Sequence, residues 1–156
     1  MIRQILLTVT ALTLVACAQQ PYRYTEPPVD PATAMARYYE EVELRSRAEM
    51  RDLATSAAAT PSDHFEARTI DRAREAMKDP AAAQIRKVRT VSHGAGGKLV
   101  CGEINGKNSY GAYTGFSRFA GTPADVRFEA SGGRDARLNA ALNGGITDAC
   151  GPGIEG

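Results

Sequence analysis

The sequence is poor in the residues from which most metal and cofactor sites are built. It has no tryptophan and only two histidines, His64 and His93, which stand far apart in the chain. Neither has a second potential ligand at metal-binding spacing, so we expect no metal site and no cofactor. A dominant sign of charge is also lacking, because 19 lysines and arginines face 18 aspartates and glutamates. Such a balance gives little long-range attraction to polyanions, and we expect no nucleic-acid partner.

A complete catalytic motif is lacking too. Gly106-Lys107-Asn108-Ser109 is similar to the end of a phosphate-binding loop, but Cys101 stands where that loop has its first glycine. One alternative is a Cys–His dyad of Cys101 with His93 across a hairpin. Another is a pair of carboxylates such as Glu103 and Glu129, which sequence spacing alone does not bring together. We therefore expect a protein that is not an enzyme and has no catalytic residue.

The apolar run at the N-terminus is too short for a permanent membrane helix. It extends from Ile5 to Val15 without a charge, after Met1 and Arg3, and it has about half of the roughly 20 residues that a bilayer requires. This layout is typical of a secretory signal. The run ends in Leu14-Val15-Ala16-Cys17, which resembles the lipobox of bacterial lipoproteins.

The lipobox resemblance implies that residues 1–16 are a signal peptide and that Cys17 receives lipid, palmitate included. The mature protein would then be held in a membrane by this lipid. Residue 18 is alanine and not the aspartate that commonly signals inner-membrane retention in this class, so we expect the periplasmic face of the outer membrane. The alternatives are a buried cysteine in an ordinary apolar helix and plain secretion with an unmodified Cys17.

Once Cys17 is assigned to lipid, Cys101 and Cys150 remain as a pair. An exported chain meets oxidising conditions, which favour a disulfide between them. Closing a loop of about 50 residues contributes roughly 4 kcal/mol in the chain-entropy model. The alternatives are two unpaired cysteines packed as small apolar residues, or Cys101 as a nucleophile.

Proline and charge divide the mature chain into three segments. Residues 17–33 contain four prolines and predict an extended tether that follows the lipid. Asp30-Pro31 is a helix-start signal, and we predict a helix from Ala32 to Ala58 within a charged segment, residues 34–60. Its apolar residues are sparse and its opposite charges stand four apart, as in Glu43 and Arg47, so we expect a spacer helix that mostly faces water. The alternative is a partner-binding stripe of Met35, Tyr39 and Val42.

Residues 61–156 predict one α+β domain. Asp63 and Glu66 form a capping-box pattern for a helix to about Lys78, with Phe65, Ile70, Ala73 and Met77 on its buried side. Asp79-Pro80 predicts a short helical turn within residues 81–85. We then expect an antiparallel sheet and a last helix, in the following order. The first two strands are Lys87–Ser92 and Leu99–Asn105, joined by a turn at 94–97. The other two strands span residues 112–119 and 126–129. The last helix runs from Asp135 to Leu142 and is ended by Asn143-Gly144-Gly145.

The segment from Met77 to Phe119 carries an ordered series of motifs. It contains Asp79-Pro80-x-x-Ala83-x-x-Arg86, then Val100-Cys101-Gly102-Glu103-Ile104-Asn105-Gly106-Lys107-Asn108, then Gly111-x-Tyr113-x-Gly115-Phe116-x-x-Phe119. This series resembles a family of small exported Gram-negative proteins with the same order of residues. Ile104 stands where valine is more usual and Ala112 where glycine is. The resemblance covers under a third of the chain and brings no activity or ligand with it.

The motif predicts a shaped loop from Asn105 to Tyr113, for which two interpretations remain. In the first, the motif encodes the fold, with Phe116 and Phe119 in the core and the polar side chains holding the loop. In the second, the loop is a binding surface. That surface would consist of Glu103, Asn105, Lys107, Asn108, Tyr110 and Tyr113. We expect Asn105 and Asn108 to serve the fold and Lys107 to serve recognition.

These observations lead to one function and two alternatives. We expect a non-catalytic outer-membrane lipoprotein that presents a small disulfide-braced domain to an unidentified envelope protein or glycan in the periplasm. The first alternative is an inhibitor or immunity-type lipoprotein that blocks a cell-wall enzyme or toxin. The second is a cell-wall hydrolase.

Overall fold

The computed structural model describes residues 28–61 and 63–151. The predicted signal peptide, Cys17 and most of the predicted tether lie outside these residues. The described chain forms helices, strands and two short 3₁₀ turns in the following order. They are α1 (Pro31–Ser56), α2 (Phe65–Glu75), η1 (Pro80–Ala82), β1 (Gln84–His93), η2 (Gly94–Gly96), β2 (Gly97–Asn105), β3 (Ser117–Gly121), β4 (Val126–Phe128) and α3 (Ala136–Cys150). Within the described ranges, no helix combines the length and the apolarity that crossing a membrane requires.

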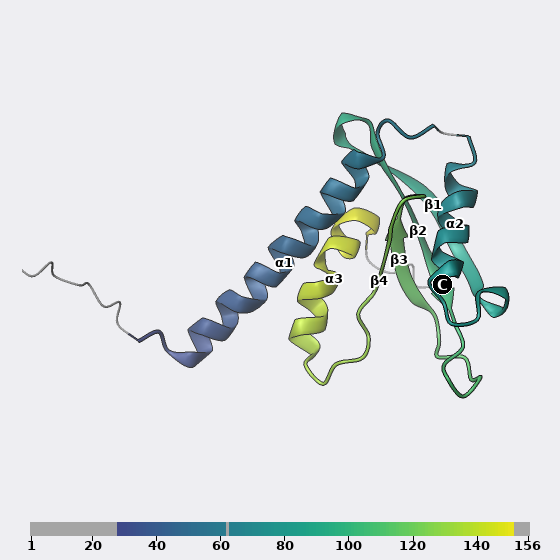
Figure 1. The fold of residues 1–156 in the computed structure, drawn as a ribbon. Coiled ribbons are helices and arrows are strands. Elements are labelled where there is room, and N and C mark those ends of the chain that lie inside the picture. The colour runs from purple at the N-terminus through teal and green to yellow at the C-terminus, as the bar shows by residue number, and fades with distance from the viewer. Residues whose placement is uncertain (1–27, 62, 152–156) are drawn as a thin grey trace, which may run out of the picture.

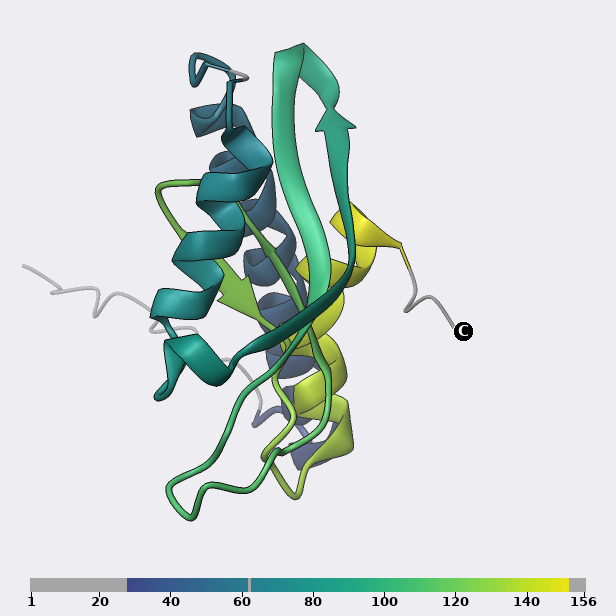
Figure 2. The same ribbon diagram turned by 90° about the vertical axis from the view of Figure 1, so that its right-hand side faces the viewer.

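The strands form one antiparallel sheet in the order β1-β2-β3-β4. Helix α2 covers one face, and α1 with α3 covers the other (Figures 1 and 2). Side chains alternate along β2, so Val100 and Ile104 pack with α2 while Cys101 packs with α1 and α3. The two faces therefore bury two apolar clusters, and the predicted α+β class is confirmed.

Helix α1 begins as the sequence predicts but packs more closely than expected. The Asp30 carboxylate accepts from the backbone N–H groups of Ala32 and Thr33, and the first turns are exposed at Met35 and Tyr38. The second half is different, because Met50 and Ala54 are buried and pack toward α3 and the sheet. Most residues of α1 are exposed, as predicted, but this half packs closely on the domain and is not a separate spacer, because small residues let the two helices approach closely.

Helix α3 does not stop at Asn143-Gly144-Gly145 but continues to Cys150. A Cβ atom added to Gly145 would overlap the carbonyl oxygen of Ser46, so α1 lies directly against the α3 backbone there. Gly145 N–H also donates to Ser46 Oγ at 3.0 Å. Gly144 and Gly145, predicted from the sequence to end the helix, instead form the surface of α3 that contacts α1. The longer helix delivers Cys150 to Cys101, with 5.8 Å between their Cα atoms, and the predicted disulfide is confirmed.

The start of α2 also differs from the prediction. The N-cap residue is His64, in the left-handed region with φ 59°, and its side chain makes no capping hydrogen bond. The Asp63 and Glu66 capping box is therefore wrong. The helix ends at Glu75, earlier than predicted, and Met77 reaches the apolar cluster from the turn beyond the helix.

The predicted hairpin is confirmed as β1 and β2 joined by η2. Its register shifts between Arg86 and Arg89, where Lys87 has φ 53° and forms a bulge. The third strand begins at Ser117 rather than at residue 112. Residues 106–116 are therefore a connection between strands and not part of one.

Candidate functional site

The connection from Gly106 to Phe116, called the projecting loop below, extends past the end of the sheet (Figure 2). Its base is closed by Asn105, the last residue of β2, which is buried. The Asn105 Oδ1 atom accepts from Gly115 N–H at 3.0 Å, and its Nδ2 donates to Gln84 Oε1 at 3.3 Å. One side chain thus joins both ends of the loop to the start of β1.

The loop forms a small hairpin with its own hydrogen bonds. Lys107 and Tyr113 pair as an antiparallel bridge, and Asn108 N–H donates to the Ala112 carbonyl at 2.9 Å. The Asn108 Oδ1 atom accepts from the N–H groups of Tyr110 and Ala112 at 2.9 and 3.1 Å. Gly111 supplies the positive φ of 79° that reverses the chain. The loop conformation is therefore fixed by contacts within the chain.

Two side chains of the loop fold back onto η1, whereas Tyr110 points away. Tyr113 Oη donates to the Ala82 carbonyl at 3.1 Å. Lys107 Nζ lies 3.7 Å from Asp79 Oδ2 and 5.4 Å from the centre of the Tyr113 ring. Tyr110 stands at the tip and is 95% exposed. The loop thus carries a large aromatic side chain in solvent on a fixed backbone.

Glu103 belongs to a separate cluster at the base of the loop. Its carboxylate accepts from Arg86 Nε at 2.6 Å and lies 3.5 Å from Lys87 Nζ. The Arg86 guanidinium also lies over the Phe116 ring, 3.7 Å from its centre. Phe116 remains 37% exposed, so the expectation that it fills the core is wrong, whereas Phe119 is completely buried.

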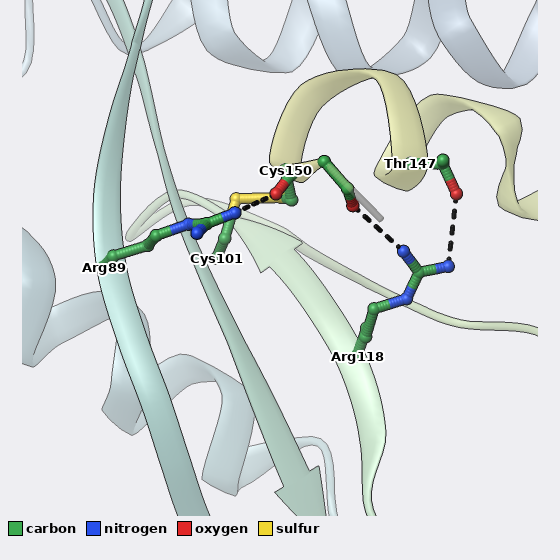
Figure 3. Close-up of a disulfide and its surroundings, with 6 residues drawn as sticks. Arg89, Cys101, Arg118, Thr147 and Cys150 are labelled. Carbon is green, nitrogen blue, oxygen red and sulfur yellow. Dashed lines mark hydrogen bonds between the residues drawn. A yellow bond between two sulfur atoms is a disulfide. The ribbon is translucent and has the colours of Figure 1, made fainter. Parts of the chain in front are cut away.

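Arginine side chains from two strands hold the carboxyl end of α3, and sequence reasoning missed them. Arg89 donates to the Cys150 carbonyl, and Arg118 donates to the Gly151 carbonyl and to Thr147 Oγ1, both at 3.2 Å (Figure 3). Cations stabilise the carboxyl end of a helix because its last carbonyls carry partial negative charge. No spacing in the sequence points to these contacts, since strand and helix are far apart in the chain.

A polar groove of about 590 Å³ runs along α3. It is lined by Glu43, Arg47, Arg118, Glu129, Ala140, Asn143, Gly144, Thr147 and Asp148. Two close ion pairs form among these residues, with Arg118 Nη2 at 2.8 Å from Glu129 Oε1 and Arg47 Nη2 at 2.7 Å from Glu43 Oε1. The hydrogen bond from the Arg118 side chain lowers the pKa of Glu129, against the opposing effect of burial. A general acid needs a raised pKa, so Glu129 is suited to holding β3 and not to donating a proton.

The disulfide bears on the two alternatives that assign chemistry to Cys101. Cys101 is bonded to Cys150 and has no thiol, so neither a nucleophilic Cys101 nor a dyad with His93 is formed. In the part of the chain that the structure describes, no three His, Cys, Asp or Glu side chains are grouped so that they could hold a metal ion.

Comparison of the chain with known proteins found no matching family model, no curated relative and no similar solved structure. The motif resemblance between Met77 and Phe119 therefore stays a prediction.

Proposed function

We propose that the protein is a non-catalytic lipoprotein, held through lipid on Cys17 at the periplasmic face of the outer membrane, whose projecting loop binds a partner in the cell envelope. The lipobox residues Leu14 to Cys17 support the anchor. The Cys101–Cys150 disulfide fits an exported protein, because such bonds persist in oxidising compartments.

The observation that carries the proposal is the fully exposed Tyr110 on a loop that is already ordered. Asn105 and Asn108 satisfy the loop backbone from within the chain, so binding would not have to order it. An ordered loop loses less conformational entropy when it binds. Tyrosine is among the residues that contribute most to protein interfaces. A rigid tip with a tyrosine in solvent is therefore well suited to recognition.

The two alternatives differ in how well the geometry supports them. A cell-wall hydrolase would need a pair of carboxylates with divided roles, but Glu103 and Glu129, the pair named from the sequence, are engaged by Arg86 and Arg118. An inhibitor or immunity-type lipoprotein is favoured by the projecting loop, because a convex tip can enter the cleft of an enzyme or toxin. We retain it as the second candidate.

The anchor is tested by replacing the acceptor thiol. Cells that make the Cys17→Ser protein should incorporate no labelled fatty acid into it and should release it from the membrane fraction or leave it unprocessed. The wild-type protein, labelled in parallel, is the control. Unchanged labelling of Cys17→Ser would exclude this anchor.

The binding role of the loop is tested with the mature chain lacking lipid, added to envelopes of the cells that make the protein. Tyr110→Ala should bind at least about 10-fold more weakly, as expected for an aromatic anchor. Lys107→Ala should weaken binding while changing stability by less than about 0.5 kcal/mol, because its ion pair is long and partly exposed to solvent. The matched control is Leu44→Ala, another exposed large residue, on α1. Equal binding of Tyr110→Ala and Leu44→Ala would contradict the proposal.

A further inference from the structure

The shape of the projecting loop limits the partners that it fits. Small ligands and glycans are usually held in concave sites of about 300 to 1,000 Å³. The hollow at the base of the loop, between Met77 and Phe128, measures only about 170 Å³. Tyr110 lies outside it, on a convex tip. A convex tip buries much of its surface only in a partner that has a cleft. This favours a folded protein with a cleft as the partner.

Charge around the base of the loop indicates the character of that cleft. Residues 76–87 and 103–117 carry four cations and two carboxylates. The cations are Lys78, Arg86, Lys87 and Lys107, and the carboxylates are Asp79 and Glu103. These carboxylates are already engaged by Arg86, Lys87 and Lys107. Arg118 and Glu129 add one paired charge of each sign beside the same hollow. The base of the loop therefore keeps a net positive charge and is called the positive collar, whereas the tip from Asn108 to Phe116 has no charge.

The exposed aromatic tip and the cations at the base of the loop together match a common type of protein interface. An aromatic anchor in a desolvated pocket, surrounded by complementary charge at the rim, is a common arrangement in protein complexes. We propose that the projecting loop inserts into the cleft of a partner protein, where Tyr110 occupies an apolar pocket and an acidic rim faces the collar of Lys78, Arg86, Lys87 and Lys107. This inference rests on the proposed function and identifies its partner as a protein with an acidic cleft, consistent with the inhibitor form of that function.

The test is site-specific crosslinking in the full-length lipidated protein. Benzoylphenylalanine at position 110 keeps an aromatic ring at the tip, and the same residue at Ser92, exposed at the far end of β1, is the matched control. We expect an adduct at position 110 whose size muramidase leaves unchanged and whose peptides include those of a second protein. Its yield should exceed that at position 92 by at least about 10-fold, as for contact at an interface centre.

Two second-site variants test rigidity and charge in the same background. Asn108→Ala, which removes the bonds that fix the tip, should reduce the adduct several-fold. Lys78→Glu should also reduce it several-fold in isolated envelopes at low salt, because it places a carboxylate before an acidic rim. Arg51→Glu makes the same charge change at an exposed site on α1 and should leave the yield unchanged.

The outcomes separate this inference from the proposed function. An adduct that muramidase removes and that contains no peptides of a second protein would overturn the protein partner while leaving a binding loop. A protein adduct of equal yield in Lys78→Glu and Arg51→Glu would overturn the acidic cleft. A yield at position 110 no higher than at position 92 would overturn both the inference and the loop's binding role.

Discussion

The contact between α1 and α3 predicts that Gly145 cannot be replaced by alanine without loss of stability. A Cβ atom at this position would overlap the carbonyl oxygen and carbon of Ser46 in the α1 backbone. Backbone cannot rotate away as a side chain can, so the helices would have to separate. Gly144, the preceding residue, offers a matched control, because the three atoms nearest to its added Cβ all belong to the Glu43 side chain, the closest at 2.7 Å, and this side chain can rotate away.

The expected magnitudes follow from two opposing effects. Alanine in place of a helical glycine stabilises by roughly 0.5 to 1 kcal/mol at either position. At Gly145, overpacking costs about 1 to 3 kcal/mol, and separation of the helices would also break the bond from Gly145 N–H to Ser46 Oγ, worth about 1 kcal/mol. We expect Gly145→Ala to be less stable by about 2 kcal/mol and Gly144→Ala to differ from wild type by under about 0.5 kcal/mol.

Urea unfolding of the mature chain, followed by circular dichroism, measures both variants. With a slope of about 1 to 3 kcal/mol per molar urea, a loss of about 2 kcal/mol lowers the midpoint by roughly 1 M. Gly144→Ala should unfold near the wild-type midpoint. If Gly145→Ala were as stable as Gly144→Ala, the close contact of α1 with α3 would be refuted, and with it our explanation of why these glycines do not end the helix.

Three further predictions concern the disulfide, the loop and the Glu129 ion pair. The double variant Cys101→Ala/Cys150→Ala should lose about 4 kcal/mol in urea unfolding, because the bond closes a loop with a sequence separation of 49; a loss under about 1 kcal/mol would contradict the chain-entropy account. Asn108→Ala should cost about 1 kcal/mol and speed hydrogen exchange at the Tyr110 amide that it releases, whereas unchanged exchange would mean that other contacts fix the tip. The pKa of Glu129 lies below its ordinary value of 4.5 in the folded protein, so its contribution to stability is present above that pH and is lost as the pH falls below it. Urea midpoints of Glu129→Gln should therefore change less between pH 6 and pH 3 than those of the wild type, and equal changes would argue against the pairing.

Local signals in the sequence predicted the elements whose structure depends on neighbouring residues. Asp30-Pro31 predicted the start of α1, and the glycines at 94–97 between β-prone runs predicted the hairpin of β1 and β2. The disulfide followed from the parity of the cysteines once Cys17 was set aside. Helix capping and turn geometry determine the first two features locally, whereas the disulfide joins distant residues and was predictable only because two cysteines remained to pair.

Long-range contacts explain the errors. Gly144 and Gly145 have a low helix propensity, but packing against the Ser46 backbone requires a residue without a side chain at position 145. Counting large apolar residues likewise underestimated the packing of α1, because the contact is made through small residues. Nothing local predicts that Arg118 lies beside the end of α3, since tertiary structure alone brings β3 and α3 together.

The candidate site shows how far the two interpretations of the loop motif can be separated. The side-chain oxygens of Asn105 and Asn108 are used by the loop backbone, so their replacement should change both folding and binding. Tyr110 contributes a backbone N–H to the same network, but its ring lies in solvent. Replacing that ring should leave the network intact and change only what the tip can contact. The motif thus encodes the shape of the loop through its asparagines, and position 110 is where a binding defect can be measured without a folding defect.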